Sequence, residues 1–137
     1  TIAREPLVVA VPDHHALATA PRLTLAAVLA EPLVIFPRRI LPSVYDAIFG
    51  VYHGAGQSPQ VAQEAIQMQT IVNLVSAGLG VAWVPESVRQ FQRPGVVYRA
   101  LVGGRGHALP ACETSLVWAS NGANPALQRF VAFARAQ

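Results

Sequence analysis

The stretch from residue 63 to 85 carries the clearest pattern of polar and apolar positions in the chain, and it predicts a helix followed by a buried strand. Its apolar side chains recur at the three- and four-residue spacing of one helix face, namely Met68, Ile71, Val72 and Val75. The helix is expected to stop at Gly78, since glycine readily takes the left-handed cap conformation. The next residues, 80–84, are almost wholly apolar, and Pro85 closes them. Such a strand needs cover on both faces.

Elsewhere the pattern alternates strands with helices, which is typical of an α/β domain with a largely parallel sheet and helices on both faces. Further strands are expected at residues 6–11, 33–36, 60–64, 96–101 and 114–119. Helices are expected at 25–30 after the cap Thr24, from Pro42 or Ser43 to Gly54 or Gly56, and after Asn124-Pro125, with a helical turn at 86–91. The pattern also predicts six buried valines: Val8, Val34, Val72, Val75, Val81 and Val84.

Composition limits the classes of protein to consider. With 137 residues, 53% of them hydrophobic and 12% charged, the chain is long and apolar enough for one domain with a real core. All ten basic residues are arginines, and the net charge of +3 is spread in ones and twos. A nucleic-acid footprint needs clustered basic side chains. This piece is therefore not expected to read DNA by itself.

The sequence predicts neither a membrane-spanning segment nor a metal site. Glu31, Pro32 and Pro37 interrupt the longest apolar run, and no basic-then-apolar leader opens the chain, so a cytoplasmic location away from membranes is expected. The lone Cys112 cannot close an intrachain disulfide, and no Cys/His cluster has zinc spacing. We expect no metal and no cofactor.

Ligands of open α/β sheets sit beyond the carboxyl ends of strands, where helix N-termini offer free N–H groups. The first such junction holds Arg38, Arg39, Pro42 and Ser43. The planar fork of arginine suits a carboxylate, which makes this junction a candidate anion site. The alternative is that both arginines are solvated loop residues that pair with Asp46.

The second junction begins the helix after residue 64, and Gln67, Gln69 and Thr70 are its polar side chains. They are candidates to donate to a ligand, and the alternative is that they only cap the helix. His14 and His15 follow a strand that ends in proline, and a surface or turn role is expected for them.

Other motifs carry less chemistry. Ser76 and Ser87 lack a nucleophile-elbow motif. The glycine-rich run 103–106 flanks no strand-to-helix junction, so an ordinary loop is expected there in place of a phosphate loop. Trp83 and Trp118 both fall in predicted strands; core packing is the expectation, and ligand stacking is the alternative.

Several segments, in order, resemble the effector-binding domain of LysR-type transcriptional regulators, an α/β fold of the periplasmic-binding-protein-like type 2 class. They are residues 5–18, 23–29, 31–37, 76–85 and 96–101, followed by the closing strand and helix. Within that family, Phe36-Pro-Arg38, Tyr45-Asp46 and residues 63–72 look similar to regulators of aromatic-compound degradation.

The resemblance implies two lobes, a continuous one at residues 6–90 and, at 91–137, the hinge and the C-terminal part of a discontinuous one. It also implies that the first half of that second lobe and a winged helix-turn-helix lie outside this chain. Without its neighbours, the returning part should expose apolar surface at 96–101 and 114–119.

The function implied by the resemblance is the sensing of a small organic acid, aromatic or muconate-like, in a homodimer or homotetramer that reaches DNA through its missing domain. A shift between two arrangements would transmit binding. A solute-binding protein of a transport system with the same fold is the alternative. No catalytic constellation supports an enzyme.

Overall fold

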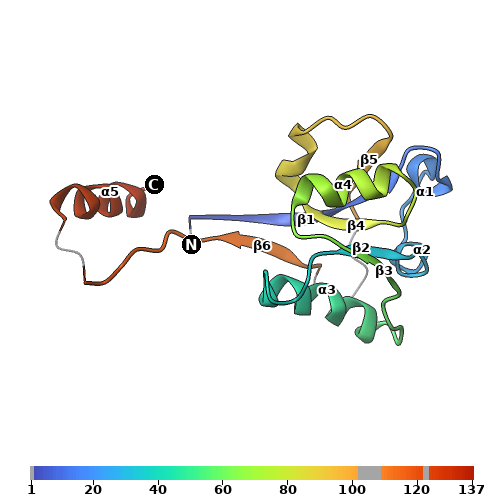
Figure 1. Cartoon of the computed structure of the whole chain (residues 1–137), viewed down its shortest axis with the longest axis horizontal. Helices are drawn as coiled ribbons and strands as arrows, with labels where there is room; N and C mark the ends of the chain where they lie inside the picture. Colours follow the sequence, from blue (N-terminus) through green and yellow to red (C-terminus); the bar gives the residue numbers. More distant parts are fainter. Residues whose placement is uncertain (1, 102–108, 122–123) are drawn as a thin grey trace.

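The computed structural model describes residues 2–101, 109–121 and 124–137. Most of the chain forms one lobe, from which β6 and the start of β1 project toward α5 (Figure 1). The elements are β1 (Ala3–Pro12), α1 (Ala16–Thr19), α2 (Leu25–Leu29), β2 (Leu33–Ile35), α3 (Pro42–Gly54), β3 (Val61–Glu64), α4 (Met68–Ser76), β4 (Ala82–Pro85), the 3-10 helix η1 (Glu86–Gln90), β5 (Val96–Arg99), β6 (Ala111–Thr114) and α5 (Pro125–Arg135).

The long strand β1 connects most of the other strands. It pairs antiparallel with β4, with β5 and, through its first four residues, with β6. β2 runs parallel to β3, and Leu33 makes a parallel bridge to Val81 just before β4. The expectation of a largely parallel sheet is therefore wrong for every pairing of β1. Apolar patterning reports burial and not strand direction, and the direction here is set by how the chain returns beside β1.

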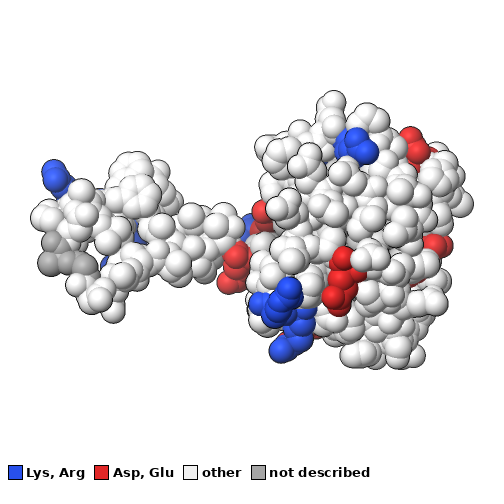
Figure 2. Space-filling view, in the orientation of Figure 1, with Lys and Arg blue, Asp and Glu red and all other residues white. Residues whose placement is uncertain are grey.

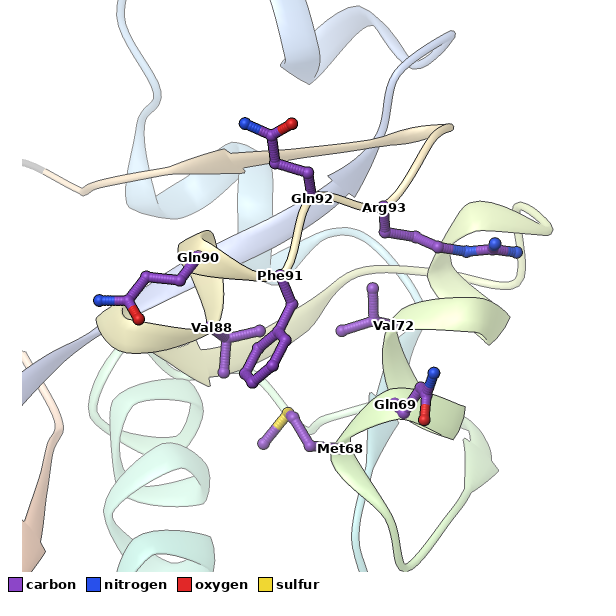
Figure 3. Close-up of a pocket in the computed structure, with 8 residues that line it drawn as sticks. All are labelled: Met68, Gln69, Val72, Val88, Gln90, Phe91, Gln92 and Arg93. Carbon is purple, nitrogen blue, oxygen red and sulfur yellow. The ribbon is translucent and has the colours of Figure 1, made fainter.

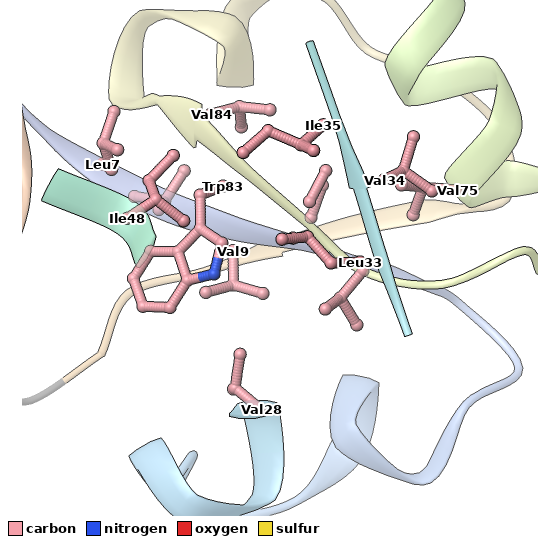
Figure 4. Packing of buried hydrophobic residues seen from close by; sticks show 14 of the residues in the cluster. Leu7, Val9, Val28, Leu33, Val34, Ile35, Ile48, Val75, Trp83 and Val84 are labelled. Atoms are coloured by element: carbon pink, nitrogen blue, oxygen red, sulfur yellow. The ribbon is translucent and has the colours of Figure 1, made fainter. Parts of the chain in front are cut away.

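The core lies among β1, β2, β4 and the helices α3 and α4 (Figure 4). α3 and α4 cover opposite sides of the strands (Figure 1). All six valines predicted to be buried are at most 5% exposed. Trp83 is buried as expected, and its Nε1 donates to the Tyr52 hydroxyl at 3.4 Å. Burial raises the pKa of Tyr52, so this phenol stays neutral in the core.

The ends of the helices follow the local signals in the sequence. Thr24 Oγ1 accepts a hydrogen bond from the Ala27 amide at 3.3 Å, and Asn124 Oδ1 accepts one from the Ala126 amide at 3.0 Å. Gly78, after α4, has φ of 87°, the left-handed conformation expected of it. Local capping chemistry therefore accounts for these boundaries.

Two side chains tie distant segments of the lobe together. Arg99 in β5 donates to the carbonyls of Leu17 and Ala20 at 2.9 and 2.6 Å, which satisfies groups at the end of α1. His15 begins the same helix: its Nδ1 accepts from the Leu17 amide, and its Nε2 lies 3.1 Å from Glu31. The turn role expected of His15 is confirmed.

The prediction of a last strand at residues 114–119 is wrong. Residues 114–119 were expected to be extended and paired, whereas β6 covers Ala111–Thr114 and no strand follows it among residues 115–119. β6 forms where β1 offers a partner, and that partner begins only at Ala3. A strand needs a neighbour to satisfy its backbone groups, and the segment after Thr114 has none among the residues described.

The apolar surface expected at 96–101 and 114–119 is present only in the second of these segments. Val117 is 85% exposed and Trp118 is 43% exposed, so core packing is wrong for Trp118, which instead lies under the Arg135 guanidinium at 5.5 Å from its ring centre. The segment 96–101 differs from the expectation, because Val96, Val97 and Tyr98 are partly buried against the core and Leu101 is buried. β5 gains this cover by pairing with β1.

Charges on the face in Figure 2 stand as separate small groups on a mostly uncharged surface. The glycine-rich run 103–106 lies outside the described residues. In the described parts of the chain, no helix is long and apolar enough to cross a membrane. Those parts also hold no group of three or more His, Cys, Asp or Glu placed to bind a metal.

Candidate functional site

The carboxyl ends of β2 and β3 meet at one edge of the lobe. The two strands are parallel, and beyond them the Ala65 amide donates to the Ile35 carbonyl at 3.1 Å. α3 begins at Pro42 after β2, and α4 begins at Met68 after β3. Both helix N-termini lie on the side of the lobe from which β6 projects (Figure 1). This edge therefore collects two partial positive charges and several free backbone N–H groups.

Arg38 is held by Asp46 at this edge. Its Nε and Nη2 donate to the two carboxylate oxygens at 2.9 and 2.8 Å, a bidentate pair between exposed side chains. The hydrogen bond from Arg38 lowers the pKa of Asp46, and the same bond raises the pKa of Arg38. The pairing is the alternative that the sequence left open, and a ligand carboxylate would have to compete with Asp46.

Arg39 lies beside it in the exposed loop, and its side chain makes no hydrogen bond or ion pair with the residues described. Pro42 and Ser43 are the first two residues of α3, whose cap residue Leu41 offers no side-chain hydrogen bond. The first turn of α3 therefore keeps backbone N–H groups available to a ligand.

Ser43 lines a shallow cavity of about 180 Å³ whose other walls include Arg4 and Glu113. Neither residue belongs to a motif or a strand-to-helix junction in the sequence. They reach α3 because β1 and β6 pair, which places Arg4 opposite Glu113, and no local pattern encodes that register. Their charged atoms lie 3.9 Å apart, a loose surface pair.

The polar residues of the second junction do not cap α4. Gln67 occupies the N-cap position, but its side chain makes no capping hydrogen bond, so that alternative is wrong for Gln67. The preferred caps are the short Ser, Thr, Asp and Asn, and glutamine carries its amide one methylene farther out. Gln69 and Thr70 are exposed in the first turn.

Gln69 lines a groove between α4 and η1 (Figure 3), while Ser43 lines the separate cavity at α3. Within the part of the chain that the structure describes, Gln69 and Ser43 thus share one edge of the lobe but line different cavities.

Aromatic side chains extend from the strand end along α3. The Phe36 ring meets the Tyr45 ring edge-on at 6.2 Å, and the Tyr45 ring stacks on the Phe49 ring at 4.2 Å. Phe36 is buried, and Tyr45 and Phe49 are partly buried. This stack fixes the first turns of α3 against the end of β2, which positions the arginine loop between them.

We expect Asp46 to titrate below its ordinary pKa of 3.8 in the folded protein, because Arg38 stabilises the carboxylate. The pairing favours folding above the unfolded-state pKa, and this contribution disappears as the pH falls through the lower folded-state value. NMR detection of the Asp46 side-chain carbon over a pH series measures the midpoint. Arg38→Gln should raise that midpoint, while Arg22→Gln, a change at an exposed arginine elsewhere, should not. An unchanged midpoint in Arg38→Gln would contradict the pairing.

Comparison with known proteins gives a consistent result. The family model of the LysR substrate binding domain matches residues 1–137. The HTH-type transcriptional regulator IlvR of Caulobacter vibrioides is 47% identical over 124 residues, which are 90% of this chain and 40% of IlvR. The chain thus spans less than half the length of this relative.

Solved structures share the fold. The crystal structure of CbnR, a LysR family transcriptional regulator, superposes with a TM-score of 0.75 at 29% identity over 98% of this chain and 45% of the CbnR chain. The BenM effector binding domain with its effector benzoate has a TM-score of 0.66 at 23% identity, over 80% of this chain and 50% of that one. The BenM likeness concerns the fold alone.

Proposed function

This chain belongs to the LysR substrate binding domain family, and from that premise we propose that it senses a small organic acid for a transcriptional regulator. The observation that carries the proposal is the edge described above. Two helix N-termini and the loop with Arg38 and Arg39 meet beyond the parallel strands β2 and β3. Such an edge favours an anion, and the adjacent aromatic stack favours an aromatic or otherwise unsaturated one.

The proposed binding residues are Arg38, Arg39, Pro42 and Ser43 at the first junction and Gln67, Gln69 and Thr70 at the second. The proposal divides the chain into a continuous lobe at 6–90 and, at 91–137, a hinge with the returning part of a second lobe. The facing wall of the cleft belongs to residues outside this chain. α5 lies apart from the main lobe (Figure 1), and Phe130 and Phe133 are exposed on it, which supports the assignment of this helix to the second lobe.

Transmission of the signal is proposed to follow a shift between two arrangements of the subunits of a homodimer or homotetramer. The acid must bind one arrangement better than the other, since equal binding changes nothing. DNA would be contacted by a helix-turn-helix region outside these residues, as is the case for IlvR, an HTH-type transcriptional regulator. The same relatives favour regulation over the transport alternative, and we propose no catalytic role.

Benzoate and cis,cis-muconate are suitable first probes, tested on the intact regulator by titration calorimetry and by DNA binding with and without the acid. We expect saturable binding of one of them and a change of about tenfold in DNA affinity at saturation. Binding that leaves both the DNA affinity and the oligomeric state unchanged would overturn the sensing role. Absence of binding by either acid would overturn the proposed class of effector.

A further inference from the structure

A groove between α4 and the segment that follows β4 is separate from the arginine loop (Figure 3). Its volume of about 630 Å³ lies within the range of small-molecule pockets in proteins. Its lining residues are Met68, Gln69, Val72, Val88, Gln90, Phe91, Gln92 and Arg93. Of these, only Gln69 belongs to the proposed effector site.

The floor and one wall of the groove are apolar. Val72 and Val88 are buried at 5% and 6% exposure, and Met68 is partly buried beside them. Phe91 is 74% exposed, and Figure 3 shows its ring directed toward Met68 and Val88, so one face of the ring is open to a ligand. An aromatic ring next to a thioether forms a surface on which a second ring packs favourably.

The charge in the groove has one sign. Arg93 extends from the loop toward the α4 side, where the Gln69 amide also lies (Figure 3). No lining residue is acidic, and the Arg93 side chain makes no ion pair with any described residue. An apolar wall with a cationic rim is complementary to a molecule that has an apolar body and one negative charge.

We propose that this groove binds an aryl monocarboxylate, with the ring against Phe91 and Met68 and the carboxylate at Arg93 and Gln69. The inference does not rest on the proposed function: the groove shares only Gln69 with the proposed effector residues, and Arg38 and Arg39 take no part in it. A ligand here contacts both α4 and residues 91–93, the segment that leads into β5, so it would also restrict movement between the two.

Met68 provides a direct reporter, because it is the one methionine of this chain. The test uses the intact protein with 13C-labelled methionine methyl groups, with the Met68 signal assigned by its loss in Met68→Leu. Cinnamate is the probe, and cinnamyl alcohol is its neutral counterpart. We expect cinnamate to shift the Met68 signal saturably through the ring current, and the alcohol to bind more weakly.

Three variants separate the contributions. Arg93→Gln should weaken cinnamate binding about three- to tenfold, a modest loss because the guanidinium is exposed. Phe91→Ala should weaken binding by about tenfold, since it removes the aromatic wall. Arg89→Gln is the matched control, an exposed arginine of η1 that does not line the groove, and it should leave binding unchanged.

Several results would overturn the inference. They are the absence of a saturable Met68 shift at millimolar cinnamate, equal binding of acid and alcohol, and unchanged binding in Arg93→Gln. A Met68 signal that shifts with protein concentration alone would assign the groove to contacts between copies of the chain and would likewise reject it. Arg39→Gln should not alter this signal, which distinguishes failure here from failure of the effector site.

Discussion

Replacement of Gly80 by alanine is expected to destabilise the protein by roughly 3 kcal/mol or more. An added Cβ would lie 2.3 Å from the Pro32 carbonyl oxygen and 2.8 Å from its carbon, both backbone atoms. That carbonyl accepts the Val81 amide at 2.9 Å, and the Val34 amide donates back to the Val81 carbonyl. The clash would therefore separate β2 from the segment entering β4 at the centre of the core. Chemical denaturation followed by circular dichroism measures the loss.

Gly50 is the matched control for this substitution. It lies inside α3, and a Cβ there meets no atom within 4 Å. Gly50→Ala should stabilise the protein by about 0.5–1 kcal/mol, because alanine loses less backbone freedom in a helix. Equal effects of the two substitutions would contradict the close approach at Gly80. A stable Gly80→Ala variant would do the same.

The contrast between these glycines shows which parts of the fold the sequence can predict. Helix ends depend on neighbours within a few residues, so Thr24, Gly78 and Asn124 could be assigned from local chemistry. The role of Gly80 depends on Pro32, 48 positions earlier, and no local pattern carries that information. The same holds for strand direction. The sequence predicts that β1 is a buried strand, but its antiparallel partners lie more than 70 residues later in the chain, at residues 82–85, 96–99 and 111–114.

The same distinction between local and long-range features applies to the candidate site. Residue chemistry places Arg38 and Asp46 near one helix start, because they are eight positions apart across a turn, but only the folded geometry shows the bidentate pair. The groove at Phe91 gave no signal in the sequence, since its walls join α4 to a loop about 20 residues later. Apolar residues scattered in a weakly patterned loop carry no periodicity to detect.

Neutralising the arginine loop is expected to have the largest effect on the proposed effector binding. Arg39 has no acidic partner among the described residues, whereas Arg38 must first leave Asp46 to meet a ligand. A charge-assisted hydrogen bond in a closed cleft is worth about 1.5–3 kcal/mol, so Arg39→Gln should weaken binding by about one to two orders of magnitude. Arg38→Gln should have a smaller effect, because Arg38 is already engaged by Asp46 and gives up that pairing when it meets the acid. Part of its loss comes from the Asp46 carboxylate, which the change leaves unpaired to repel the acid.

Titration of the intact regulator with its effector measures both variants, and Arg22→Gln serves as the control. Arg22 is also an exposed arginine, but it precedes α2, away from the arginine loop in the sequence. A double change of Arg38 and Asp46 to neutral residues should restore part of the affinity lost in Arg38→Gln alone, since the unpaired carboxylate is gone.

If affinity is unchanged in both Arg38→Gln and Arg39→Gln, the loop is a solvated one and the anion is bound elsewhere. Gln67, Gln69 and Thr70 at the start of α4 would then be the residues to change next, because that helix end offers the other set of free N–H groups at the same edge.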